Sequence, residues 1–538
     1  MNCIKNMKVI SSLEKLYDTD SIPEKSLSAF SMLKNEKKSF QLAVESTEEH
    51  EASLTVTSGL KDIRIYTVEH IKSDFPMDKK DADDYFRFSE SGYYPDLLLP
   101  AKEKFTLKKG ITVLWFEVNA SLNTAGSHTV ELTLGDKSAT VNIEIIDAEL
   151  DFNNFVYTNW FHTDCLMSHY NFDAFSEEYW RVTENFLQTA ADYGMTCVLT
   201  PLFTPALDTQ IGGERPTVQL VDVTVNNGAY SFNFDKLTRW IEMAHRCGIK
   251  YFEFSHFYTQ WGARRTPKIM ATVDGEYKRI FGWDTRANSK KYRTFLKSFS
   301  VQLKSYVEKR GLKNNVLIHV SDEPNFSMPL SYGRAAKYIR SLFNGYRIVD
   351  ALSDFRFYKL GIVPNPIPAT DHIDSFIGKV DDLWTYYCSG QRKHCVSNRF
   401  FCNESLRTRI IGYQLYKFNI TGFLHWGYNF YYTQLSKAVI NPFEVSDAGG
   451  KFPSGDSYVV YPAPDGTAYH SIRLKVFFDA LQDMAALNTL EKLTDKKTAL
   501  NLIEENGRHN LTFRNYPHDN EWMLRTREAV NAAIKERI

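Results

Sequence analysis

The chain has 538 residues, of which 43% are hydrophobic and 24% are charged, and its formal net charge is −1. This length exceeds what one ordinary hydrophobic core supports, so two or three domains are expected. A net charge near zero argues against a strong field that would attract nucleic acid or an anionic membrane. No apolar run reaches the roughly 18 residues of a membrane-spanning helix, so no span is expected.

The first residues, MNCIKNMKVISSLEKLYD, contain no long apolar stretch of the kind found in a secretory signal. The chain as given is therefore expected in the cytoplasm, although an exported protein whose signal had been removed would look the same. The seven cysteines are odd in number and scattered, which is not typical of a disulfide framework. Most of them are interpreted as reduced, buried thiols.

Residues 1–150 are rich in short segments that alternate apolar and polar side chains and are separated by Gly, Asn and Asp. The clearest of these strand-like segments cover residues 52–59, 111–120, 127–135 and 138–150. Short strands at this spacing predict an all-β sandwich domain. The proline-bounded stretch at residues 93–100 is expected to be a structured loop.

From about residue 151 the pattern changes to apolar runs that alternate with amphipathic segments of helical length. The expected strands are residues 155–162, 195–203, 249–256, 315–322, 346–353, 373–378, 383–388 and 421–426. Eight strand–helix units predict a (β/α)₈ TIM-like barrel over residues 151–489. The charged segments at residues 490–538 are expected to form a short C-terminal helical extension that packs on the barrel.

In such a barrel the active site lies at the C-terminal ends of the strands. Several expected strands of this chain end in polar or aromatic residues, which are unusual there unless they serve a site. The candidates are Trp160, His162, His256, Asp322, Glu323, Trp384, Tyr386, Trp426, Tyr428 and Asn429.

The fourth expected strand, NVLIHVSDEP, ends in two consecutive carboxylates, Asp322 and Glu323, followed by Pro324. Proline disfavours helix at the preceding residue, so Glu323 is expected to be extended and the two side chains to diverge. Adjacent acids suit one scheme of glycoside hydrolysis, in which the 2-acetamido group of the sugar substrate itself attacks the anomeric carbon. Asp322 would orient that amide, and Glu323 would protonate the leaving oxygen and then activate water. The alternative is an ordinary solvated helix start, because acids and proline favour first turns.

The aromatic strand ends have similar alternatives. Trp160, Trp384 and Trp426 could enclose the acetamido methyl group, and Tyr386 could hydrogen-bond its oxygen. His162 and His256 could contact sugar hydroxyls. Each such residue is also common in a core or at a rim. Glu253 is a further acid near a strand end, and alternation from His256 could turn it towards the helices.

Seven stretches together resemble glycoside hydrolase family 123, the β-N-acetylgalactosaminidases, and the related uncharacterised bacterial group. They are GYYPDLLLP, LWFEVNASLNTAG, HVSDEP, WTYYCSG, GFLHWGYNF, GDSYVVYPAPDG and SIRLKVFFDALQD, and they extend almost to residue 485. The resemblance implies a β-sandwich followed by a (β/α)₈ catalytic domain, with no metal and no organic cofactor. It also implies substrate-assisted retention of configuration.

By this resemblance, Asp322 is the stabilising acid and Glu323 is the acid/base. Trp384, Tyr386, Trp426, Tyr428 and Asn429 lie in matching stretches, and their roles are inferred from position. The implied function is exo-release of terminal β-linked N-acetylgalactosamine from an oligosaccharide, glycoprotein or glycolipid glycan. The oligomeric state is not predicted.

Two alternatives stay open at this level. One is a carbohydrate-binding protein without catalysis on a barrel scaffold. The other is a glycosidase of different sugar specificity, such as a β-N-acetylglucosaminidase. A phosphoryl-transfer enzyme is disfavoured, because neither G-x-x-x-x-G-K-[ST] nor G-x-G-x-x-G occurs in the chain.

Overall fold

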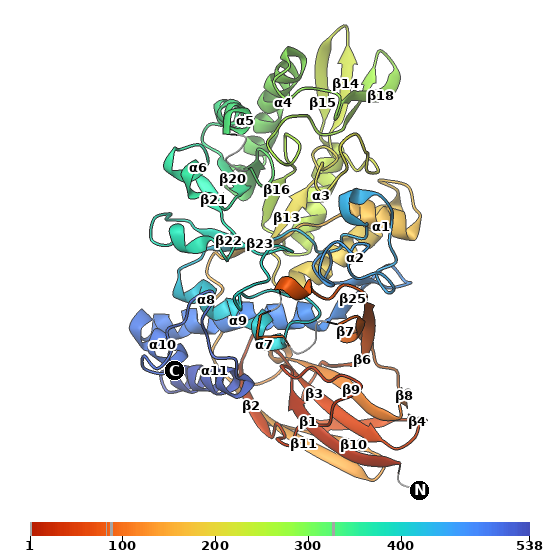
Figure 1. Cartoon of the computed structure of the whole chain (residues 1–538), viewed down its shortest axis with the longest axis vertical. Coiled ribbons are helices and arrows are strands. Elements are labelled where there is room, and N and C mark those ends of the chain that lie inside the picture. The colour runs from red at the N-terminus through yellow and green to blue at the C-terminus, as the bar shows by residue number, and fades with distance from the viewer. Residues whose placement is uncertain (1–2, 82, 87–89, 325–328) are drawn as a thin grey trace.

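The computed structural model describes residues 3–81, 83–86, 90–324 and 329–538. A β-rich part formed by the start of the chain lies at one end, and a larger part with alternating strands and helices lies at the other (Figure 1). The long helix α9 (Ile472–Leu493) runs between the two parts. None of the helices in the described ranges is both long enough and apolar enough to span a membrane.

The β-rich part consists of two sheets that share one core. The order of the larger sheet is β1 (Ile4–Ser11), β3 (Lys37–Ser46), β9 (Gly110–Asn119), β6 (Ile63–Ser73), β7 (Gly92–Pro100), β25 (Ala468–Ser471) and β24 (Tyr461–Pro462). The order of the smaller sheet is β2 (Ala29–Leu33), β11 (Lys137–Ile146), β10 (Gly126–Leu134) and β5 (Leu54–Ser58). Alternate side chains such as Phe40, Phe116, Val130 and Ile143 are buried in one cluster. Strands thus fill the region expected to be β-rich, and β24 and β25 extend it from far along the chain.

The loop expected at residues 93–100 is wrong, because this stretch forms strand β7 (Gly92–Pro100). The two prolines in this stretch had indicated a loop. Pro95 pairs with His70 at a register irregularity of the ladder, where a missing N–H is tolerated. Pro100 is the last residue of the strand. Another small difference is a two-stranded sheet of β4 (His50–Ala52) and β8 (Phe105–Leu107).

The larger part is built on eight parallel strands in a single sheet. Their order is β21 (Asn365–Ile367), β20 (Arg347–Ala351), β19 (Val316–His319), β16 (Tyr251–Phe254), β13 (Cys197–Thr200), β12 (Val156–Asn159), β23 (Gly422–His425) and β22 (Trp384–Tyr386). The two outermost strands meet through backbone hydrogen bonds. The Tyr386 N–H donates to the Pro368 carbonyl at 3.1 Å, and the Tyr386 carbonyl accepts from the Thr370 N–H at 2.9 Å. The sheet therefore curves into a near-barrel.

Seven of the eight expected barrel strands are present, and the sixth is wrong. Residues 373–375 form a 3₁₀ turn, and the sixth strand is β21 (Asn365–Ile367). Ile373 and Phe376 are both buried, a spacing of three that suits a helical turn better than a strand. Pro366 and Pro368 hid the true strand from a sequence pattern.

Full (β/α)₈ alternation is not confirmed. Long helices follow the early strands, namely α2 (Glu177–Asp192), α3 (Asp235–Arg246), α4 (Lys290–Lys309) and α5 (Pro329–Leu342). Between β20 and β23 only short helices occur, namely α6 (Phe355–Lys359), α7 (Ser405–Arg409) and α8 (Ile411–Lys417), and the long helix α9 follows β23 after an extended loop. A separate sheet of β14 (Asp222–Asn226), β15 (Ala229–Asn233), β17 (Ile269–Val273) and β18 (Glu276–Phe281) projects beyond α3 and α4 (Figure 1). Helix α1 (Thr163–Tyr170) follows the first barrel strand.

Buried ion pairs join the two parts around α9. Arg473 on α9 donates to both carboxylate oxygens of Asp96 on β7, at 2.7 and 2.9 Å. Lys475 pairs with Glu117 on β9 at 2.8 Å. Helices α10 (Lys496–Ile503) and α11 (Asn520–Lys535) pack on α9, and α11 also contacts β2 of the sandwich. Because breaking a buried pair leaves an uncompensated charge, these contacts fix the sandwich against the barrel.

Candidate active site

The two adjacent acids lie just beyond the end of β19, where a barrel presents its active site. The Trp261 N–H donates to the Asp322 carbonyl at 3.1 Å and holds this segment against the loop after β16. The extended conformation expected for Glu323 is wrong, because its φ is +42°. Left-handed backbone is strained for a residue with a side chain, and it is doubly unfavourable before Pro324. Such strain is typical of functional sites and re-aims Glu323 relative to Asp322.

Asp322 and Glu323 line a cavity of about 160 Å³ at the C-terminal ends of the strands. Six of the ten candidates from the sequence are in its wall. They are Trp160, His162, Asp322, Glu323, Tyr386 and Trp426. Phe430 and Phe452 add two further aromatic faces. The result is a small hollow with aromatic walls and two carboxyl groups on one side.

The two acids differ in their contacts. The Tyr386 hydroxyl donates to Glu323 Oε1 at 2.8 Å. No hydrogen bond to the Asp322 carboxylate comes from any residue within the described ranges. Burial, and then the negative charge of Glu323, raise the pKa of Asp322 well above its usual range. Asp322 therefore keeps its proton to a higher pH than an isolated carboxyl group does.

A buried charge network lies beneath the acids. His319 Nε2 contacts Glu253 Oε1 at 2.5 Å, and its Nδ1 lies 3.4 Å from Asp350. Burial disfavours the charged imidazole, but Glu253 and Asp350 outweigh it and raise the pKa of His319 to about 10. The resulting imidazolium lowers the pKa of Asp322 against the dominant effects. It thus partly offsets the burial and the negative charge of Glu323, which disfavour the ionised form of Asp322.

Glu253 points into the barrel interior and not towards the helices. It accepts from Thr158 Oγ1 at 2.6 Å and from Trp160 Nε1 at 2.8 Å, in addition to its contact with His319. The Glu253 carboxylate therefore orients Trp160 in the wall of the cavity and also stabilises the positive charge of His319 beneath the acids. The orientation of Glu253 depends on which strands flank it, which sequence alternation alone does not specify.

A second network orients the opposite wall. Arg215, which pairs with buried Asp164 at 2.8 Å, donates to His162 Nδ1 at 3.1 Å. Because Arg can only donate, His162 carries its proton on Nε2 and gives it to the Trp426 carbonyl at 2.9 Å. Burial, and then Arg215, lower the pKa of His162 to about 4, so this histidine is neutral. The Trp426 indole donates to Asp456 Oδ2 at 3.0 Å, which fixes the plane of the ring.

Four other sequence candidates lie outside the wall of the cavity. Trp384 is 2% exposed and packs on Gly422 inside the barrel. His256 is buried with its ring 4.3 Å from that of His319. Asn429 holds the backbone of His162 through both its amide atoms, at 2.8 and 3.1 Å. Tyr428 bonds the Phe186 carbonyl at 3.0 Å. These positions support the cavity from behind.

Sequence reasoning missed several residues of the wall. Trp261, Gln260 and Asp208 come from loops after the second and third strands, and Phe452 comes from the long loop after the eighth. Only Trp261 left a usable signal, since it is a tryptophan in a Gly- and Arg-containing loop and is 40% exposed. Burial raises the pKa of Asp208 to about 6, which could not be read from its neighbours in the chain.

Two clusters in the described ranges have the composition of a metal site: Asp83, Asp84 and Cys395 form one, and the other lies beneath the acids. Candidate ligand atoms of His256, His319 and Asp350 lie within 4.8 Å of one another. Both nitrogens of His256 are buried without a hydrogen-bond partner. Both nitrogens of His319 already face carboxylates. A cation bound to this ring would have to displace an imidazolium proton that faces Glu253 or Asp350. The geometry fits an imidazolium between two acids.

Comparisons with known proteins agree with this arrangement. A family model described as "Glycoside hydrolase 123, catalytic domain" matches residues 160–490, more than half of the chain. A comparison with curated protein sequences gave no match. Among solved structures, the chain is similar to a family 123 glycoside hydrolase from Clostridium perfringens described for glycolipid glycan hydrolysis. The TM-score is 0.75 at 16% identity, over 99% of both chains.

A second structure, an FMN-binding beta-glucuronidase from Facaelibacterium prausnitzii L2-6, matches with a TM-score of 0.31 and 8% identity, over 83% of this chain and 59% of that one. A TM-score this low adds nothing about the fold. The first match is similar over the whole length, so the β-rich part, the near-barrel and their junction occur together in both proteins.

Proposed function

The chain belongs to glycoside hydrolase family 123, and from this premise we propose that it releases terminal β-linked N-acetylgalactosamine with retention of configuration. The proposal rests above all on one observation. Two adjacent acids, only one of which has a hydrogen-bond partner in the described residues, face a single small cavity with aromatic walls. A carboxylate left unpartnered among buried groups is ready to accept a donor from a ligand.

The size of the cavity supports action at a chain end. About 160 Å³ is well below the roughly 300–1,000 Å³ of pockets that hold larger ligands. One sugar ring fills such a space, and the rest of the glycan must lie outside. The aromatic faces of Trp160, Trp426 and Phe430 suit the C–H face of a pyranose and the methyl group of an acetamide.

The proposed reaction needs no enzyme nucleophile. Asp322, whose ionised form the His319 imidazolium favours, accepts the acetamido N–H and aligns the amide oxygen with the anomeric carbon. The oxygen attacks, the bond to the leaving group breaks, and Glu323 gives its proton to the departing oxygen. The positive oxazolinium ion that forms is stabilised by Asp322. Glu323, now a carboxylate, takes a proton from water, and that water opens the ring from the same face as the leaving group.

Tyr386 holds the acid/base in place. Burial, and then the charge of Glu323, raise the pKa of the Tyr386 hydroxyl far above its usual value, so it stays a neutral donor. Its hydrogen bond to Glu323 stabilises the carboxylate formed after proton transfer. The glycolipid glycans named for the Clostridium perfringens relative are a natural first substrate class to examine.

A chromogenic panel tests the proposal. The β-N-acetylgalactosaminide should be cleaved, the β-galactoside should not, and the α-anomer should be inert. A thiazoline mimic of the oxazolinium should inhibit. Equal cleavage of the β-galactoside would exclude participation of the acetamide. Faster cleavage of the β-N-acetylglucosaminide would change the assigned sugar to N-acetylglucosamine and leave the mechanism intact. Sugar binding without turnover would show that the protein is not an enzyme.

A further inference from the structure

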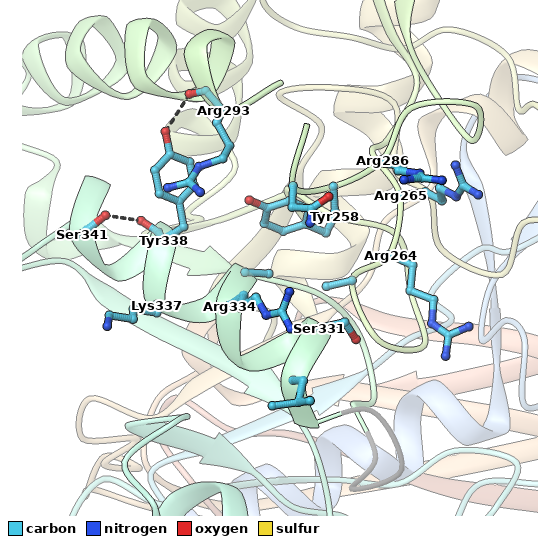
Figure 2. Close-up of a pocket in the computed structure, with 15 residues that line it drawn as sticks. Tyr258, Arg264, Arg265, Arg286, Arg293, Ser331, Arg334, Lys337, Tyr338 and Ser341 are labelled. Atoms are coloured by element: carbon cyan, nitrogen blue, oxygen red, sulfur yellow. Dashed lines mark hydrogen bonds between the residues drawn. The ribbon is translucent and has the colours of Figure 1, made fainter. Parts of the chain in front are cut away.

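A large hollow is separate from the cavity that holds the acids. Its volume is about 920 Å³, and it lies between the loop around residues 258–265, the segment 286–293 that leads into α4, and the helix α5. Six cationic side chains line it, namely Arg264, Arg265, Arg286, Arg293, Arg334 and Lys337. We call this hollow the basic pocket. Figure 2 shows the loop arginines on one side of Tyr258 and the helical cations on the other.

The charge of the basic pocket is unbalanced. No acidic side chain lines it, and none of the six cations forms an ion pair with a carboxylate in the described part of the chain. Elsewhere the chain pairs its arginines closely, as in Arg279 with Glu214 at 2.5 Å or Arg239 with Glu177 at 2.6 Å. The whole chain has a net charge of −1, so this accumulation is not a by-product of a basic protein. Like charges held together repel unless an anion joins them.

The side chains in the pocket can recognise an oxyanion. Guanidinium groups bind carboxylate and sulfate oxygens through paired N–H donors. Arg334 and Arg264 lie to either side of Ser331 in Figure 2, and both are exposed. Tyr258 and Tyr338 supply aromatic faces, and the Arg293 guanidinium lies 4.3 Å from the centre of the Tyr338 ring. The pocket combines charge for an acid group with flat surfaces for a sugar ring.

The chain connects the basic pocket directly to the mouth of the cavity. Trp261 lines the cavity and also an outer cleft of about 590 Å³ that contains Glu323. Arg264 follows three residues later, which places it within about 10 Å of Trp261 along the chain. On the other wall, Ser331 at the start of α5 donates to the Gly262 carbonyl at 2.9 Å. A glycan that leaves the cavity past Trp261 can therefore reach Arg264 and Arg334.

We propose that the basic pocket binds an acidic group, a sulfate ester or a sugar carboxylate, on the leaving-group side of the glycan substrate. The direction of the glycan rests on the proposed function, whereas the affinity of the pocket for acidic sugars does not. A concave site between two walls suits a short free oligosaccharide better than a flat lipid surface. The enzyme is thereby expected to prefer acidic glycans over their neutral counterparts.

Binding is measured first, with oligosaccharides that carry no terminal N-acetylhexosamine, so that turnover plays no part. Sulfated and sialylated forms should bind about tenfold more tightly than the matched neutral forms at low salt. The preference should shrink with inorganic sulfate as competitor and in the variants Arg264→Gln and Arg334→Gln. Arg508→Gln, an exposed arginine near the C-terminus, should keep it. Equal affinity for charged and neutral forms, or a preference that both pocket variants retain, would overturn the proposal.

Turnover is measured second, on terminal β-N-acetylgalactosaminides whose next sugar is neutral or acidic. The ratio of kcat/KM for the acidic over the neutral substrate should fall about tenfold in Arg264→Gln and Arg334→Gln. If no hexosaminide is cleaved, the proposed function fails and the binding result still decides the pocket. If hydrolysis occurs with no acidic preference, the pocket proposal fails alone. Retention on phosphatidylserine vesicles without affinity for free acidic glycans would replace it with a membrane contact.

Discussion

The cavity that contains Asp322 and Glu323 and the basic pocket are two neighbouring hollows with opposite charge arrangements. In the cavity, acids lie on a buried network in which Glu253, His319 and Asp350 compensate one another. In the basic pocket, six cations face solvent without a carboxylate partner in the described residues. Buried charges are costly and must be paired, so their protonation is coupled. Exposed cations cost little in water and are free to bind a passing anion.

The largest effect is expected at Asp322. Asp322→Asn removes the charge that stabilises the oxazolinium, so kcat/KM should fall by roughly a thousandfold. Asp381→Asn, an exposed acid just before β22, is the matched control and should keep full activity. Steady-state kinetics on a β-N-acetylgalactosaminide decide it. Retained activity in Asp322→Asn would mean that the two hollows do not differ in catalytic role.

The same variant sharpens the comparison through stability. The pKa of Asp322 is raised in the folded protein, so its ionised form is disfavoured there and stability falls as pH rises through that pKa. Asparagine has no such ionisation, so Asp322→Asn should melt at a higher temperature than the wild type at pH 7. A lower melting temperature would show that the ionised Asp322 carboxylate does not destabilise the fold.

The second effect is expected at His319, where the buried network carries its positive charge. His319→Gln should lower kcat/KM about ten- to a hundredfold, and its loss raises the pKa of Asp322, so the acidic limb of the pH–rate profile should move to higher pH. Breaking this buried pair should cost roughly 3–5 kcal/mol of stability. A merely structural histidine would lower stability without moving the pH profile.

The pH dependence of stability gives an independent check on His319. Its pKa of about 10 lies above the ordinary value of 6.5, so its stabilisation is fully present below pH 6.5 and is lost as pH rises towards 10. Urea unfolding between pH 6 and 10 should show this loss in the wild type and not in His319→Gln. His128→Gln, on the partly exposed face of β10, should behave as the wild type.

The smallest effect is expected at two tryptophans. It distinguishes a residue in the wall of the cavity from one that is buried behind the wall. Trp426→Phe keeps an aromatic face but loses the bond to Asp456, so KM should rise several-fold with little change in melting temperature. Trp384→Phe should lower stability by about 1–3 kcal/mol and leave KM unchanged, because this ring is buried behind the wall. The opposite outcome would place Trp384 in the site.

The likeness between sequence expectation and structure is uneven for physical reasons. Strand ends could be located because apolar runs stop where a barrel opens, which placed Asp322, Glu323, Tyr386 and Trp426 at one cavity. Prolines hid β7 and β21, since their tolerance depends on which partner strand lies opposite. The positive φ of Glu323 could not be foreseen, because proline at the next position favours an extended backbone.

The sequence by itself determined the order of a β-rich part and a barrel-like part, the family, and the adjacent acids at the end of the fourth barrel strand. These depend on local periodicity and on short motifs, which are properties of consecutive residues. Only the tertiary structure decided that His319 is charged beneath Asp322, that Glu253 faces inward, and that arginines from three separate segments share one pocket. Burial and electrostatic coupling depend on distances in space, and residues far apart in the chain set those distances.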